Sequence, residues 1–223
     1  MLSLKFLGHA AFQLDRDGNE TLLMDPFITG NPQAETGLEE IGADYILISH
    51  GHDDHLGDAF AIAKAHNSLI ISTSEIARLA SKNGLNSHAQ HLGGKHKFSF
   101  GSVKLTLAFH GAGIPGGHAC GFVIEYFNQL IYFAGDTALF GDMKLIGDLH
   151  KLDVALLPIG DNFTMGLDDA VVATTFLKPR LVIPYHYNTW PVIEADPEDF
   201  KTKVESNTES KCVILKAGQR LSL

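Results

Sequence analysis

The sequence contains little cysteine and no long apolar run, and both shortages restrict the class of protein. Cys120 and Cys212 are the two cysteines among 223 residues, too few for a disulfide framework and suited to a reducing cytoplasm. No apolar run approaches the roughly 20 residues that a membrane-spanning helix needs. Lys5 lies within the apolar part of the first residues, so we expect a first strand there and no signal peptide. We therefore expect a cytoplasmic protein with no membrane partner.

Positive charge is also scarce. The 17 Lys and Arg residues are outnumbered by 26 Asp and Glu residues, which gives a formal net charge of −9, and no basic cluster stands out. A broad nucleic-acid-binding face needs clustered positive charge, so this pattern argues against a nucleic-acid partner. Two bound divalent cations would add about four positive charges that this count omits. The composition, 45% hydrophobic and 19% charged, is that of an ordinary globular protein.

Short apolar strands alternate with turns and helical stretches along the whole chain. Strands are expected at residues 4–7, 11–14, 21–24, 45–49, 69–72, 103–109, 121–125, 130–133, 154–157, 181–184 and 212–215. Helices are expected at about residues 58–65, 75–83 and 168–177. Helices that alternate with buried strands in both halves predict an α/β layered fold, and the length suits a single domain of residues 1–223.

The segment His50-Gly51-His52-Asp53-Asp54-His55 is the most informative part of the chain. It places three imidazoles and two carboxylates directly after the apolar run Tyr45–Ser49. Imidazole and carboxylate are the ligands that borderline divalent cations such as zinc prefer. A solvated loop that happens to be rich in His would scatter its polar residue types, so the pattern favours a metal site. Asp53 is the spare position of the motif, and we expect it to face solvent or to cap the following helix.

Further ligand types follow other apolar strands. His110, Asp136, His186 and Asp25 each come at the carboxyl end of an apolar run, which is where α/β sheets present their sites. Such a residue alone would more often be structural. Four strands that converge on one edge with metal-ligand types indicate a site.

The number of ligands predicts two metals. Alternate residues of an extended segment face the same way, so His50 and His52 can bind one cation together, whereas Asp54 and His55 can turn to a second. Each cation can then have three ligands of its own and share one carboxylate. The ligands of the first are His50, His52 and His110, those of the second are Asp54, His55 and His186, and the shared carboxylate is Asp136. Such a pair of metals lowers the pKa of a shared water, and a metal-bound hydroxide then acts in hydrolysis. Zinc is the expected metal, with manganese or iron as alternatives.

These residues resemble the metallo-β-lactamase superfamily, which has a four-layer αββα sandwich fold. The resemblance rests on His-x-His-x-Asp-His with the later His110, Asp136 and His186, and it spans residues 25–186. Residues 8–12, 25–27, 158–166 and 186–189 are similar to a branch of small metal-dependent hydrolases related to ascorbate-phosphate lactonase-like proteins. True β-lactamases of the superfamily generally have Cys or Ser where this chain has Asp136. The resemblance therefore implies lactonase, thioesterase or phosphodiesterase chemistry rather than β-lactam hydrolysis.

Several residues receive roles beside the ligands. His118 competes with His110 as the third ligand of the first metal, and the strand-end position favours His110; His118 could instead touch substrate. Asp25 is expected to orient a metal-bound His through its other ring nitrogen. The resemblance implies that His9 lines the pocket, and we assign it and Asp54 to catalysis.

Four polar residues near the later strands are open to two interpretations. Asp161, Asn162 and Thr164 precede a helix and could be caps, but the resemblance implies a pocket wall just as well. Asn188, in the stretch 186–189, is placed in the pocket by the same resemblance. Three histidines in a polar stretch are expected to be solvated: His88, His91 and His96.

We expect a hydrolase with two divalent metals that acts on a small ester, lactone or thioester. One alternative is a phosphodiesterase or ribonuclease-like enzyme, which the acidic composition disfavours. Another is a non-catalytic metal or ligand sensor on the same fold, which would not need an open, water-activating pair of metals. The sequence leaves the substrate, the metal and a homo-oligomeric state open.

Overall fold

The computed structural model describes residues 2–223 and divides the chain into two compact units. Unit 1 contains the described residues up to Gly94 together with residues 111–119 and 216–223, and unit 2 contains residues 95–110 and 120–215. Each unit is built around one seven-stranded sheet. Both units are discontinuous in sequence. The single domain expected from the length stays a prediction.

The sheet of unit 1 is mixed. Its order is β14-β1-β2-β3-β4-β5-β6, antiparallel from β14 to β3 and parallel from β3 to β6. Its strands are β1 (Leu2–Gly8), β2 (Ala11–Arg16), β3 (Asn19–Met24), β4 (Tyr45–Leu47), β5 (Leu69–Thr73), β6 (Ser87–Gln90) and β14 (Arg220–Ser222). Its helical elements are η1 (Leu38–Glu40), α1 (Asp53–Leu56), α2 (Ala59–His66) and α3 (Ser74–Lys82). The parallel half of the sheet is the half that leads into the helices.

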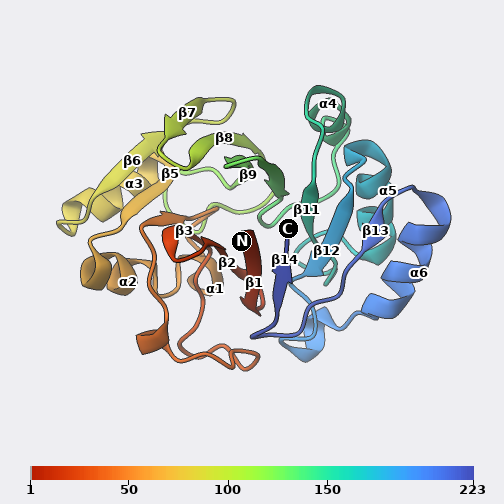
Figure 1. The fold of residues 1–223 in the computed structure, drawn as a ribbon, viewed down its shortest axis with the longest axis horizontal. Coiled ribbons are helices and arrows are strands. Elements are labelled where there is room, and N and C mark those ends of the chain that lie inside the picture. The colour runs from red at the N-terminus through yellow and green to blue at the C-terminus, as the bar shows by residue number, and fades with distance from the viewer. Residues whose placement is uncertain (1) are drawn as a thin grey trace. The chain divides into compact units, whose positions relative to one another are not determined.

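Helices α2 and α3 lie beside β5 and β6 (Figure 1). The apolar side chains of these helices pack with one face of the strands into a core, which includes Ile46, Ile70, Ile62 and Ile76. Burial of aliphatic side chains of this size stabilises the unit by about 1.5–3 kcal/mol each. The core therefore holds the ends of β3 and β4, where the polar residues of interest begin.

The sheet of unit 2 is also mixed. Its order is β13-β12-β11-β10-β9-β8-β7, parallel from β13 to β10 and antiparallel from β10 to β7. Its strands are β7 (Lys95–Phe98), β8 (Gly101–Leu107), β9 (Cys120–Tyr126), β10 (Gln129–Phe133), β11 (Val154–Pro158), β12 (Leu181–Tyr185) and β13 (Lys211–Cys212). Its helical elements are α4 (Met143–Leu149), α5 (Leu167–Leu177), η2 (Pro191–Ile193) and α6 (Pro197–Asn207).

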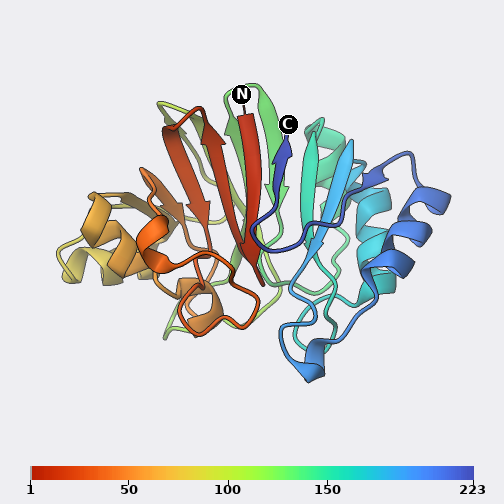
Figure 2. The ribbon, with the colours of Figure 1, turned by 60° about the horizontal axis from the view of Figure 1, so that its bottom comes forward.

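Helices α5 and α6 run along the strands of this sheet (Figure 2). Every residue of β11 is buried, as the continuous apolar run predicted for a central parallel strand. The helix–sheet core includes Leu157, Val182, Ala173 and Phe200. This packing fixes the ends of β10, β11 and β12 relative to one another.

Most expected elements are present, and several were missed. The expected helices correspond to α2, α3 and α5, and α5 has Asp168 and Asp169 in its first turn as predicted. The expected last strand at residues 212–215 is wrong, because β13 ends at Cys212 and the last strand is β14. Strands β6 and β7 and helices α4 and α6 were not predicted. Among the described residues, no helix is both long enough and apolar enough to cross a membrane.

Candidate metal centre

The histidine motif of unit 1 begins in the loop after β4 and ends in α1. His50 is buried, and His52 is the extended residue from which α1 begins. His50 Nε2 lies 2.8 Å from His52 Nδ1, so the alternate histidines of the extended part converge. Helix α1 begins at Asp53, and its His55 ring remains close to His50, with 4.2 Å between the two ring centroids. Asp53 is exposed, in agreement with its expected position toward solvent.

A glycine-rich loop, residues 111–119, packs against this motif. The Gly51 N–H donates to the Ala112 carbonyl at 2.8 Å. A Cβ on Gly51 would lie 2.5 Å from Ile114 Cγ2, and a Cβ on Gly113 would lie 2.3 Å from the His52 nitrogen. Since real Cβ atoms do not approach so closely, both backbones need glycine. A Cβ on Gly111, the residue after His110, would lie 3.5 Å from the His52 ring.

Asp25 directly follows β3, and its buried carboxylate contacts Ser49 and His55. Its Oδ1 accepts a hydrogen bond from the Ser49 N–H at 2.7 Å, and its Oδ2 accepts from the Ser49 hydroxyl at 2.5 Å. The same Oδ2 lies 2.7 Å from His55 Nδ1. Complete burial raises the pKa of Asp25, and the hydrogen bonds from His55 and Ser49 oppose this rise. The contact with His55 is the one that the expected orienting role of Asp25 requires.

His9 lies beside the second half of the motif. Its side chain is completely buried, and its Nε2 is 3.1 Å from Asp54 Oδ2. Ligand atoms of His9, Asp54 and His55 all lie within 4.8 Å of one another. The edge-to-face contact of the ring with Phe27, 5.9 Å between centroids, and the hydrogen bond from the His9 N–H to Gln33 Oε1 hold it in place. His9 is thus available for proton transfer at Asp54.

Unit 2 brings together three of the four strand-end residues singled out in the sequence, namely His110, Asp136 and His186. Asp136 follows β10 and is nearly completely buried. Its Oδ2 lies 3.6 Å from His110 Nε2 and 3.1 Å from His186 Nε2. One carboxylate therefore contacts both His110 and His186.

Buried hydroxyl groups hold the three segments of unit 2 in place. The Thr137 hydroxyl accepts a hydrogen bond from the Phe109 N–H at 3.0 Å, next to His110. The Tyr185 hydroxyl donates to the Gly135 carbonyl at 2.5 Å and so ties the neighbour of His186 to the neighbour of Asp136. The sequence analysis missed Thr137 and Tyr185. Their adjacency to ligand types was the only signal.

Comparison with known proteins identifies the family. The model of the β-lactamase superfamily domain matches residues 3–186. A UPF0173 metal-dependent hydrolase of Natranaerobius thermophilus is 49% identical over 222 residues, and one of Pelotomaculum thermopropionicum is 50% identical over 230 residues; each alignment covers all of both chains. The chain belongs to this family of metal-dependent hydrolases.

A solved structure supports the same assignment. Igni18, a metallo hydrolase from the archaeon Ignicoccus hospitalis, has a TM-score of 0.93 and 37% identity, with 99% of this chain and 97% of that chain covered. The predicted metallo-β-lactamase type of α/β fold is confirmed, and so is the prediction of an enzyme that depends on metal for hydrolysis.

The donor chemistry of this metal-dependent hydrolase fits a divalent cation. Each unit offers imidazole nitrogens beside carboxylate oxygens, and the two cysteines are free, buried and assigned to strands. A closed structural zinc site would instead be rich in Cys. His50, His52, Asp54 and His55 would hold metal from unit 1; the donors of unit 2 would be His110, Asp136 and His186.

The remaining predicted residues of the hydrolase occupy less central positions. His118 is exposed in the loop of residues 111–119. The interpretation of Asp161, Asn162 and Thr164 as helix caps is wrong, because Gly166 is the residue from which α5 begins and no side chain caps it.

These three residues form a turn of their own instead. The Asn162 N–H donates to Asp161 Oδ1, and the Thr164 hydroxyl donates to the Met165 carbonyl. Asn188 binds both the N–H and the carbonyl of Ala195, which closes the loop after β12. Asn188 also lines a hollow formed by residues 188–191 and 194–197. Whether any of these residues lines the substrate pocket stays a prediction.

Proposed function

We propose that this hydrolase binds two divalent cations, zinc by preference, and cleaves a small ester, lactone or thioester. The membership in a metal-dependent hydrolase family supports the metal and the reaction class. The observation that carries the pair of metals is the position of Asp136. The finer assignment of substrate rests on the resemblance noted in the sequence and on the acidic composition.

The Asp136 carboxylate fits the role of a bridge between the two proposed metals. Its Oδ2 contacts His110 and His186, which the sequence assigned to different cations. A carboxylate within reach of one donor from each set can give one oxygen to each metal. A Cys or Ser at this position would offer one ligand atom only.

The ligand sets suggested by the sequence would give each proposed cation three donors besides Asp136. The first cation would have the imidazoles of His50, His52 and His110. The second would have the Asp54 carboxylate and the imidazoles of His55 and His186.

In the proposed hydrolysis, the protein positions the metal ligands and supplies one group that donates a proton to the leaving group. A pair of divalent cations, when bound, lowers the pKa of a shared water and stabilises the developing oxyanion. Asp25 holds the His55 ring so that Nε2 faces the site. We propose that His9 holds a proton at Nε2, beside Asp54, for the leaving oxygen or sulfur. Because the His9 ring is buried and packed on Phe27, its position changes little during the reaction.

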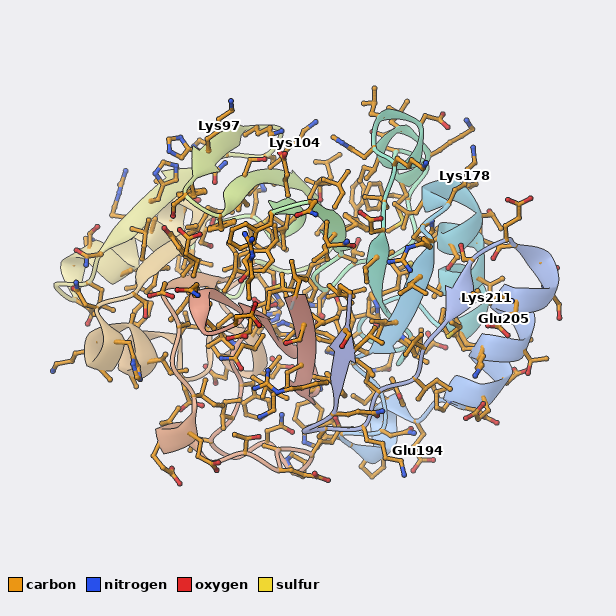
Figure 3. All side chains as sticks on the ribbon, in the orientation of Figure 1. Lys97, Lys104, Lys178, Glu194, Glu205 and Lys211 are labelled. Atoms are coloured by element: carbon orange, nitrogen blue, oxygen red, sulfur yellow. The ribbon has the colours of Figure 1, made fainter. Side chains whose placement is uncertain are left out.

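A small substrate is favoured over nucleic acid by the overall charge. Among the residues labelled in Figure 3, Lys97 and Lys104 belong to the paired strands β7 and β8, and the others belong to other parts of unit 2: Lys178 after α5, Glu194 after η2, Glu205 in α6 and Lys211 in β13. A formal net charge of −9 does not favour binding to a nucleic-acid backbone.

Metal titration combined with a substrate screen tests the proposal. Chelator-stripped protein is titrated with zinc, manganese or iron, and each form is assayed on lactones, thioesters, esters and phosphodiesters. We expect two metals per chain and hydrolysis of a carboxylic substrate that is lost on chelation. Saturation at one metal would refute the pair. Preference for phosphodiesters would favour the alternative enzyme class, and binding of two metals without any hydrolysis would favour a sensor.

A further inference from the structure

We propose that Ser49 is a positioning residue that transmits the orienting effect of Asp25 to His50. Its hydroxyl places the ring proton of His50 on Nδ1 and leaves Nε2 as a metal donor. This inference rests on the proposed function, in which His50 and His55 are ligands. It assigns a role to a residue that precedes the histidine motif and that the motif itself does not include.

The geometry is a short chain of buried polar groups. The Ser49 hydroxyl lies 2.5 Å from Asp25 Oδ2 and 2.9 Å from His50 Nδ1. All three side chains are completely buried. The Ser49 N–H also donates to Asp25 Oδ1, which fixes the serine backbone on the same carboxylate. Buried groups of this kind lose much when one partner is removed.

Counting protons determines the direction of each hydrogen bond. A serine hydroxyl has one proton to donate, and the Ser49 hydroxyl donates it to Asp25 Oδ2. The Ser49 proton therefore lies toward Asp25, and the oxygen of Ser49 must accept from His50 Nδ1–H. His50 Nε2 is then unprotonated. This assignment also allows His50 Nε2 to accept from His52 Nδ1, 2.8 Å away, when no metal is bound.

Asp25 acts on His55 without an intermediary. The 2.7 Å contact between Asp25 Oδ2 and His55 Nδ1 places the ring proton of His55 on Nδ1 by the same argument. One carboxylate thus orients a donor of each proposed cation, directly for His55 and through Ser49 for His50. Loss of the Ser49 hydroxyl should weaken the first metal position and spare the second.

Nuclear magnetic resonance of ring nitrogens in the metal-free wild-type chain tests the proton positions directly. We expect the neutral rings of His50 and His55 to carry their proton on Nδ1. A His50 ring protonated on Nε2 would overturn the proposal. This measurement needs no variant, so it decides the matter even if a substitution at Ser49 prevents folding.

Metal titration of variants tests the consequence. We expect Ser49→Ala to bind one of its two metals about 10–100-fold more weakly than wild type, the usual effect of losing an outer partner of a ligand. Ser49→Thr keeps the hydroxyl and should restore most of the affinity. Asp25→Asn should weaken both metals.

Ser72→Ala is the matched control. Ser72 is also completely buried, and its hydroxyl donates to the Ile48 carbonyl at 2.6 Å without contact to a ligand. Equal metal affinities in Ser49→Ala and Ser72→Ala would overturn the proposal. Wild-type protein that binds no metal pair would instead refute the proposed function, so the two failures are distinguishable.

Discussion

Gly51→Ala should separate the histidine motif from the loop of residues 111–119. Gly51 lies between two proposed ligands, and its N–H donates to the Ala112 carbonyl. The new methyl group would meet Ile114 Cγ2 at 2.5 Å and the Ala112 oxygen at 3.2 Å. Gly51 does not have a positive φ, so alanine is not strained by the backbone conformation there. The loss of stability therefore comes only from the clash of the new methyl group with Ile114 and Ala112.

The size of the effect follows from the atoms involved. A methyl group forced into a packed site typically costs about 1–3 kcal/mol. Cγ2 of Ile114 is attached to a stiff, β-branched Cβ and cannot rotate away freely. We expect a loss of about 2 kcal/mol in the free energy of unfolding, which for a chain of this size lowers the Tm by roughly 4–8 °C.

A double-mutant cycle in denaturant isolates this contact. Removal of the obstructing side chain by Ile114→Ala should make Gly51→Ala much less destabilising, with a coupling of about 1 kcal/mol or more. Gly141→Ala is the control, because a Cβ on Gly141 meets no atom within 4 Å. Additive effects of Gly51→Ala and Ile114→Ala, or a Gly51→Ala protein as stable as Gly141→Ala, would refute the reasoning.

Three further predictions concern the ligands and a buried thiol. Asp136→Ala should lose bound metal in elemental analysis while Asp53→Ala keeps it, because Asp136 contacts His110 and His186 whereas Asp53 is exposed; equal metal content would contradict the bridge. His110→Ala should likewise lose metal while His118→Ala keeps it, and the reverse result would exchange their assignments. Burial raises the pKa of the Cys212 thiol to about 12, above an unfolded value of about 8.5, so its contribution to stability is complete below about pH 8.5 and is lost as pH rises toward 12. Urea unfolding should therefore show a smaller alkaline loss of stability for Cys212→Ala than for wild type, and parallel losses would exclude this cause.

The sequence predicted the central strands well because each is a continuous apolar run that ends in a polar residue. It missed elements whose pattern is weak. Helix α6 buries only Phe200 and Val204, which is too little for a visible helical period. Helix α4 contains Gly147, and glycine is a poor helix former. A larger residue would not fit there, because a Cβ on Gly147 would lie 2.2 Å from the Phe176 carbonyl oxygen of α5. Close packing between helices is a tertiary requirement that local sequence does not reveal.

In the candidate site too, the sequence predicted some residues and missed others. Ligand types at strand ends were visible, since position and residue type coincide at residues such as Asp136 and His186. The hydroxyls of Ser49, Thr137 and Tyr185 were not, because a hydroxyl residue in a strand or at its end is ordinary in any protein. Their role depends on partners that are distant in sequence, 24 residues away for Ser49 and 50 for Tyr185.

The interleaving of the two units has a consequence for biosynthesis. Residues 216–223 return to unit 1, where β14 pairs with β1 at the opposite end of the chain. As the chain leaves the ribosome, the sheet of unit 1 thus lacks β14 until residues 220–222 emerge. Pairing between such distant segments is slow compared with local pairing. Until then the nascent chain would expose an unpaired β1 edge, which is a site where aggregation can begin.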